Sequence, residues 1–149
     1  MFYIRNFSSR RKNTVMIHLF TDRLLVSIDR IDEQHRKIFE TVGKFQDACN
    51  EGKSIEEINE LFNLLKVYIE DHFKQEEEYM LKYTYPDYEM HKEKHNVFIR
   101  KLHLLDSTIR ANYISITKLV EINEFLSEGF VTHLSEIDSK LGEFLRDKI

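Results

Sequence analysis

The sequence of 149 residues contains no tryptophan, one cysteine, one proline and four glycines. Because Cys49 has no second cysteine to pair with, an intrachain disulfide is excluded, and so is a small secreted fold held by disulfides. The few prolines and glycines favour long, uninterrupted helices over a sheet with many turns. No apolar run approaches the roughly 20 residues that a helix needs to cross a bilayer. We therefore expect an all-α protein of the cytoplasm, with no membrane partner.

The charges of the chain are nearly balanced, with 22 Lys and Arg against 26 Asp and Glu. No basic stripe follows the first dozen residues, so a nucleic-acid partner is not expected. Residues 1–17 carry basic side chains but no apolar stretch long enough for a signal peptide. We expect these residues to form an N-terminal tail, with Met16 as an alternative start, and residues 18–149 to form one domain.

Four segments place apolar residues in steps of three and four, as amphipathic helices do. The second opens on a capping box, Ser54 to Glu57, and Pro86 suits the first turn of the third. Four such helices with short connections predict an all-α, up-down-up-down antiparallel four-helix bundle. The predicted helices span about Asp29–Asn50, Ser54–Lys82, Pro86–Ile109 and Ser115–Arg146.

Histidines and acids interrupt the apolar stripe of every predicted helix. The pattern places these side chains in the interior, where an imidazole or a carboxylate is costly unless it is paired or binds a metal. The interrupting residues are His35 on the first helix, His72 and Glu76 on the second, His91 and His95 on the third, and His133 and Asp138 on the fourth.

The types and spacing of these residues predict a metal site. A spacing of four puts His72 beside Glu76, and His91 beside His95, on common helix faces. Imidazoles and carboxylates without cysteine suit first-row metals such as iron, manganese or zinc. The set is too large for one tetrahedral zinc and suits two ions with both carboxylates bridging. A single histidine on an apolar face is more often a hydrogen-bonded core residue, so the prediction depends on the convergence of all four helices.

The fourth helix poses a geometric problem, because Asp138 follows His133 by five residues. On an ideal α-helix five residues turn through about 500°, which leaves the two side chains about 140° apart. Either the Asp138 side chain reaches across, or the helix is distorted locally, for example by a π-bulge. We favour the reaching side chain as the expectation.

These motifs resemble those of the hemerythrin family. The string IDEQH at residues 31–35 is similar to the first-helix signature of bacterial hemerythrins, and HFKQEE at residues 72–77 is similar to their HFxxEE motif. Tyr85 and Pro86, followed by HxxxH at residues 91–95, resemble the loop and third helix. The pair at residues 133 and 138 resembles the last motif, and the likeness covers roughly residues 19–145.

The resemblance implies two non-haem iron ions, bridged by Glu76, Asp138 and an oxo or hydroxo group. His91, His95 and His133 would ligate and saturate one iron. His35 and His72 would ligate the other iron, which keeps an open position for dioxygen. The apolar residues that the resemblance places around the dioxygen, where they exclude water, are Ile38, Phe73, Phe130 and Leu134.

The function that this resemblance implies is reversible dioxygen binding for storage, transport or delivery, with an oxygen-using enzyme as a candidate recipient, and not catalysis. One alternative is a di-iron oxidase or peroxidase, although ferritin-like enzymes use sites rich in Glu with two Glu-x-x-His motifs. A sensor module for oxygen or iron and a metal-free bundle are further alternatives.

The chain departs from the family pattern in its lack of tryptophan. Hemerythrins usually carry one near the start of the domain, where this chain has Phe20, and one four residues before the last histidine, where it has Gly129. We therefore expect a cavity or a water path beside Gly129, near the iron with the open position.

Overall fold

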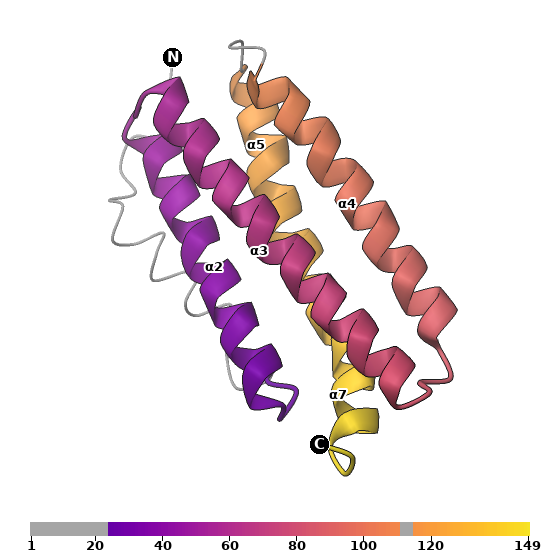
Figure 1. Cartoon of the computed structure of the whole chain (residues 1–149). Coiled ribbons are helices and arrows are strands. Elements are labelled where there is room, and N and C mark those ends of the chain that lie inside the picture. Colours follow the sequence, from indigo (N-terminus) through magenta and orange to yellow (C-terminus); the bar gives the residue numbers. More distant parts are fainter. Residues whose placement is uncertain (1–23, 111–114) are drawn as a thin grey trace.

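The computed structural model describes residues 24–110 and 115–149, and it is an antiparallel four-helix bundle (Figure 1). The predicted tail at residues 1–17 lies outside the described residues. The first three helices are α2 (Asp29–Asn50), α3 (Ile55–Lys82) and α4 (Tyr88–Arg110). No strand occurs in the described part of the chain, and none of its helices is long and apolar enough to cross a membrane. The predicted fold class is confirmed.

The fourth helix of the bundle is divided into five consecutive segments. Figure 1 shows it running down the back of the bundle, antiparallel to α4. Its segments are α5 (Ile116–Glu124), η2 (Phe125–Gly129), α6 (Phe130–His133), η3 (Leu134–Asp138) and α7 (Ser139–Leu145), where η marks a π-helical turn.

The helix ends are determined by residues close to them in the sequence. The Ser54 hydroxyl accepts a hydrogen bond from the backbone N–H of Glu57 at 3.2 Å, so the predicted N-cap of α3 is confirmed. After α2 the chain turns at Gly52 with φ of +66°, a conformation that favours glycine. Helix α4 begins at Tyr88, two residues after Pro86, and the backbone N–H of Tyr88 donates to the carbonyl of Tyr85.

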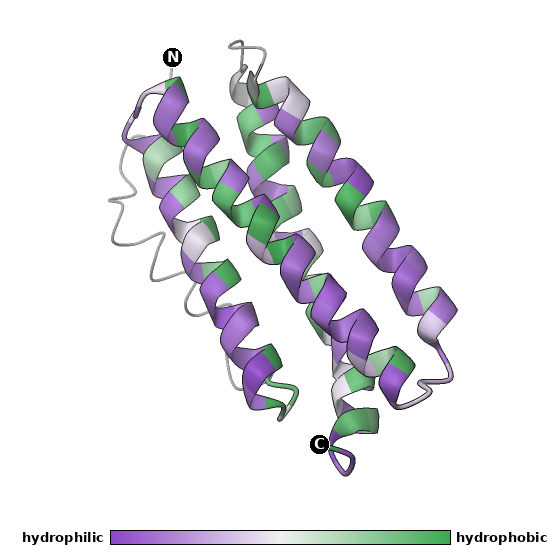
Figure 2. Cartoon of the chain, viewed as in Figure 1, coloured by the Kyte–Doolittle hydropathy of each residue, from purple (hydrophilic) through white to green (hydrophobic). Residues whose placement is uncertain are grey.

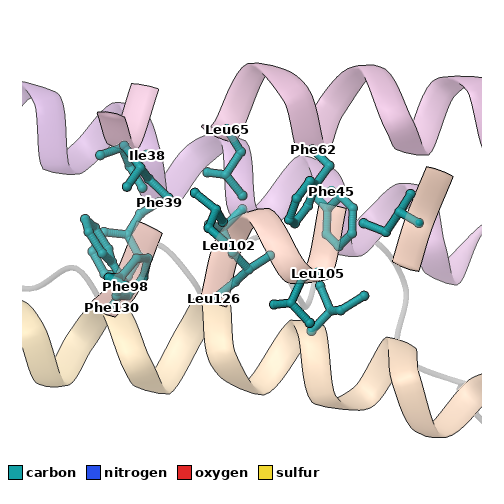
Figure 3. Packing of buried hydrophobic residues seen from close by; sticks show 14 of the residues in the cluster. Ile38, Phe39, Phe45, Phe62, Leu65, Phe98, Leu102, Leu105, Leu126 and Phe130 are labelled. Atoms are coloured by element: carbon teal, nitrogen blue, oxygen red, sulfur yellow. The ribbon is translucent and has the colours of Figure 1, made fainter. Parts of the chain in front are cut away.

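The interior contains two apolar layers with a polar layer between them. The larger layer includes Phe45, Phe62 and Phe130 (Figure 3). The smaller layer includes Ile31, Met80 and Leu141 and lies toward the C-terminal end of the fourth helix. Each helix shows hydrophobic and hydrophilic residues along its length (Figure 2), as amphipathic helices of a bundle must. Along each helix the predicted metal-binding residues lie where the larger layer gives way to the smaller one, so apolar side chains border the polar layer at both ends.

The expectation that Asp138 reaches across a regular helix is wrong. Residues Leu134–Asp138 form a π-helical turn, in which the N–H of Ser139 donates to the carbonyl of Leu134, five residues earlier. Because a π turn accommodates one extra residue, the step of five from His133 to Asp138 keeps both side chains on the inner face. A second π turn, Phe125–Gly129, was not foreseen.

Gly142 permits a close approach between the fourth helix and the segment before α2. A Cβ atom at this position would lie 2.5 Å from the Cβ and 2.7 Å from the carbonyl oxygen of Val26, so neither backbone could remain in place. We expect Gly142→Ala to lower the free energy of unfolding by about 1–3 kcal/mol, measured by chemical denaturation.

Gly129→Ala is the matched control for that substitution. Gly129 has an ordinary helical φ of −62°, and its added Cβ would meet its nearest neighbour, the Phe125 ring, at 3.4 Å. This variant should be as stable as the unmodified chain or more stable by up to about 1 kcal/mol, because alanine favours the helix over glycine. Equal losses in both variants would mean that the contact with Val26 is not what restricts position 142.

Candidate metal centre

The polar side chains that interrupt the four stripes meet in the middle of the bundle. All of them are buried, with exposed fractions from 0 to 6%. Their donor atoms form two groups in which every atom lies within 4.8 Å of the others. One group contains His35, His72, Glu76 and Asp138, and the other contains Glu76, His91, His95, His133 and Asp138.

The carboxylate of Glu76, on α3, divides its two oxygens between the groups. Its Oε1 lies 2.9 Å from Nε2 of His72, which belongs to the smaller group. Its Oε2 lies 3.0 Å from Nε2 of His91 and 3.2 Å from Nε2 of His95, both on α4. Glu76 therefore presents one oxygen to each set of histidines.

Asp138, at the end of the π turn η3, divides its oxygens in the same way. Its Oδ2 lies 3.0 Å from Nε2 of His35, on α2. Its Oδ1 lies 2.9 Å from Nε2 of His133 and 3.2 Å from Nε2 of His91. Two carboxylates thus join a group with two histidines to a group with three.

Several donor atoms of this cluster are buried and make no hydrogen bond of good geometry, although other polar atoms of the cluster lie about 3 Å away. They include Glu76 Oε1, Asp138 Oδ1, and the Nε2 atoms of His95 and His133. An unsatisfied buried polar atom costs about 1–3 kcal/mol, and more when the group is charged. Metal ions would satisfy these atoms, because the donor atoms of each group lie within 4.8 Å of one another. The residues present therefore fit a metal centre.

Two side chains outside the cluster hold its histidines in place. Nδ1 of His72 lies 2.8 Å from Oε1 of Gln34, and because an amide oxygen can only accept, the imidazole donates its Nδ1–H. On the other side, Nδ1 of His95 lies 3.4 Å from Oε1 of Glu77. Both contacts direct the Nε2 atoms toward the interior, as metal ligands require.

The roles of these two residues do not follow from the sequence pattern. Gln34 does not continue the apolar stripe, and Glu77 is an acid in a run of charged residues. The structure shows Glu77 half-buried rather than solvated, with a side-chain exposure of 22%. Their positions could have identified them, because Gln34 directly precedes His35 and Glu77 directly follows Glu76.

Replacing Gln34 tests whether its hydrogen bond with His72 contributes to metal affinity. Gln34→Leu removes the acceptor for the His72 N–H, so the imidazole loses its fixed orientation. We expect the affinity for iron to fall about 10–100-fold, measured by competition with a chelator of known affinity. Glu33→Leu, at an exposed neighbour on the outer face of α2, should leave the affinity unchanged. A similar loss in both variants would show that the effect does not come from the contact with His72.

The electrostatics of the cluster favour ionised carboxylates. Burial and the charge of Asp138 raise the pKa of Glu76, but contacts with His72 and His35 outweigh them and hold that pKa well below its usual range. Burial lowers the pKa of His72, yet the carboxylates of Glu76 and Asp138 raise it to about 9. Burial also lowers the pKa of His91, but the carboxylates of Asp138 and Glu76 raise it to about 9. In the protein without metal, His72 and His91 therefore hold protons that a metal must displace.

Apolar residues surround the cluster. The Phe73 ring stacks on His95 with centroids 3.9 Å apart and lies 5.9 Å from His72. Phe130 meets the edge of His35 at 5.9 Å and belongs to the larger apolar layer (Figure 3). Ile38 and Leu134 are buried in the same layer. The four apolar residues predicted around the dioxygen thus lie in one continuous layer that borders the cluster.

A pocket of about 390 Å³ opens beside Gly129, where a cavity was expected. Its position differs from the expectation, because its lining includes His133 but neither His35 nor His72. The reason is the orientation of the fourth helix, which turns Gly129 toward Phe98 and Phe125 instead of the two-histidine group.

His103 lies outside the cluster, as its place beside Leu102 and off the apolar stripe of the third predicted helix indicates. It is exposed on α4, and its Nε2 lies 2.8 Å from Oε1 of Glu70 on α3, also at the surface. His18 lies outside the described residues. The structure therefore separates five interior histidines from a surface one within the described ranges.

The antiparallel bundle and its buried histidine–carboxylate cluster define a class of metal-binding four-helix proteins. Within that class, a family model described as the hemerythrin HHE cation binding domain matches residues 26–145. The chain belongs to the hemerythrin family, as the motifs predicted.

Three similar proteins support the same family assignment. A bacteriohemerythrin of Clostridium acetobutylicum is 27% identical over 123 residues, which cover 80% of this chain and 95% of the relative. A bacteriohemerythrin of Methylococcus capsulatus is 29% identical over 76% of this chain and 85% of its own length. A myohemerythrin of Theromyzon tessulatum is 30% identical over 77% of this chain and 82% of its own length. Each of these similarities covers at least 76% of this chain.

Proposed function

We propose that this chain binds dioxygen reversibly at a pair of non-haem iron ions and is not an enzyme. The observation that carries the proposal is the division of oxygens at Glu76 and Asp138, each of which presents one oxygen to the two-histidine group and one to the three-histidine group. This arrangement supplies bridging ligands for two ions and leaves the ions with unequal numbers of ligands.

The ligands of the two ions follow from this division. His91, His95 and His133, with one oxygen from each carboxylate, would fill most positions of one iron. His35 and His72, with the remaining oxygens, supply fewer donors to the second iron, which keeps room for a small ligand. The membership of the two donor groups supports this assignment.

Iron is the metal that the donor set and the family favour. The cluster contains imidazoles and carboxylates but no thiolate, because Cys49 belongs to a different part of the bundle. A pair of ferrous ions supplies the two electrons that dioxygen takes up when it binds and gives back when it leaves.

The protein's own side chains make such binding reversible by excluding water. Phe73 and Phe130 cover the histidines with apolar rings, and both are almost completely buried. Apolar walls deny protons and water access to the bound ligand, which would otherwise be lost irreversibly. Gln34 holds His72 so that its Nε2 does not rotate out of the site.

Metal analysis and visible spectroscopy test the proposal together. The full chain, loaded anaerobically with excess ferrous iron and desalted, should retain about two irons per chain, because the donor atoms exceed one coordination sphere. Its visible spectrum should gain an absorption band in air and lose it again under argon. A ratio near one, a preference for zinc, or a band that persists under argon would overturn the proposal.

The enzymatic alternatives are separated by turnover. An oxidase or peroxidase built on the same cluster would consume hydrogen peroxide or a reductant continuously, whereas a reversible carrier would take up dioxygen once per site. We expect no sustained consumption by the iron-loaded protein.

A further inference from the structure

The pocket beside Gly129 has the dimensions and lining of a small-molecule site. It lies between α4 and the fourth helix, and its volume of about 390 Å³ falls within the roughly 300–1,000 Å³ of typical ligand pockets. One wall comes from α4, with Val97 and Phe98 among its residues, and the other comes from η2, α6 and η3. The full lining is Lys94, Val97, Phe98, Lys101, Phe125, Gly129, Thr132, His133, Glu136 and Ile137.

Two aromatic rings form the floor of this pocket. Phe98 and Phe125 lie with ring centroids 4.5 Å apart and planes tilted by 35°. The Cβ that Gly129 lacks would lie 3.4 Å from Cδ2 of Phe125 and 3.9 Å from Cε2 of Phe98. Beside Gly129 the pocket borders the partly exposed Phe125 ring and the edge of the mostly buried Phe98 ring, and a planar aromatic molecule can pack against them in the offset or edge-on arrangements that rings prefer.

The charges at the rim do not favour an ion of either sign. Nζ of Lys101 is engaged by Oε1 of Glu121 at 2.9 Å. The remaining rim charges are Lys94 on α4 and Glu136 on the opposite wall, which have opposite signs. An anionic ligand would face Glu136 and a cationic one would face Lys94, so attraction on one side is offset by repulsion on the other and does not compensate for removing the ligand's charge from water.

We propose that this pocket binds an uncharged planar aromatic molecule of about the size of indole. The molecule packs against Phe98 and Phe125 in the space beside Gly129, with one edge on His133. This binding does not depend on dioxygen and goes beyond the function proposed above. It covers a side of the polar cluster where His133 borders a pocket that opens to solvent.

Indole itself is a suitable probe, because the chain contains no tryptophan and its own fluorescence comes from tyrosine alone. Titrating the purified, metal-loaded full chain into indole should give a saturable change in indole fluorescence. Indole-3-acetate and tryptamine, which add a negative and a positive charge, should each bind about tenfold more weakly or worse, a difference of about 1.4 kcal/mol. Equal affinity for all three, or no saturable binding of indole, overturns the proposal.

A substitution that fills the pocket locates the site. Gly129→Leu places a side chain over the two rings and should weaken indole binding at least about tenfold, whereas Ser135→Leu adds the same side chain at an exposed position outside the pocket and should leave it unchanged. If Gly129→Leu does not fold, Thr132→Phe narrows the pocket from its exposed rim and should have the same effect. Undiminished binding in a folded pocket variant places indole elsewhere and overturns the proposal.

Discussion

His133→Ala is expected to lose iron and to lower the free energy of unfolding by about 3–5 kcal/mol, because it removes the imidazole that lies 2.9 Å from the buried Oδ1 of Asp138. Removing the metal from the unmodified chain should also lower the melting temperature, since the donor atoms that lack hydrogen bonds are then unsatisfied in the interior. Thermal unfolding followed by circular dichroism, with metal analysis of the same samples, measures both effects.

His103→Ala is the matched control for this experiment. His103 is exposed and has only a surface contact with Glu70, so the variant should keep its iron and its stability should change by no more than about 0.5 kcal/mol. Equal losses from the two substitutions would contradict the separation of interior and surface histidines. A metal-free protein as stable as the loaded one would contradict the proposal that metal binding stabilises the interior.

Deleting Ser135 is expected to preserve the metal centre, although it removes a residue between two proposed ligands. The π turn η3 accommodates one extra residue between His133 and Asp138. Without it the two side chains are four residues apart, and a regular α-helix places residues at that spacing on one face. The shortened chain should therefore bind about two irons, as the unmodified chain is expected to do.

Deleting Lys74 provides the contrast, because it lies at an exposed position of a regular α-helix. The deletion rotates the part of α3 after it by about 100° relative to the part before it. His72 and Met80 can then no longer both face the interior, so we expect the variant to lose its iron and most of its stability. If deletion of Ser135 abolishes iron binding as completely as deletion of Lys74, the π turn is not what aligns His133 with Asp138.

Most of the cluster could be predicted from the sequence, because residues on the buried face of a helix recur every three to four positions. His35, His91 and His95 each continue a stripe of apolar residues at steps of three and four, so their interior positions follow from the helix period alone. The same reasoning placed His103 at the surface. The bounds of α2 and the N-cap of α3 were equally local, because they depend on backbone conformation and on hydrogen bonds between residues close in sequence.

The outer partners of the cluster could not be predicted in this way. Glu77 stands in a run of charged residues, and its sequence neighbours give no reason for it to leave solvent. It is half-buried because His95, on a different helix, lies 3.4 Å from its carboxylate. Contacts between helices depend on the rotation of each helix about its own axis, which one helix's pattern does not specify.

By itself, the sequence determined the four helices, the inward face of each and the residues that meet between the two apolar layers, because each of these follows from the periodicity of a single helix. Only the tertiary structure decided how the step of five between His133 and Asp138 is accommodated. Phe130 and Leu141 must both face the interior while Gly142 lies against Val26, and a π turn satisfies these constraints together. The tertiary structure also decided that the pocket beside Gly129 borders His133, because the rotation of the fourth helix against α4 sets which histidine lies next to it.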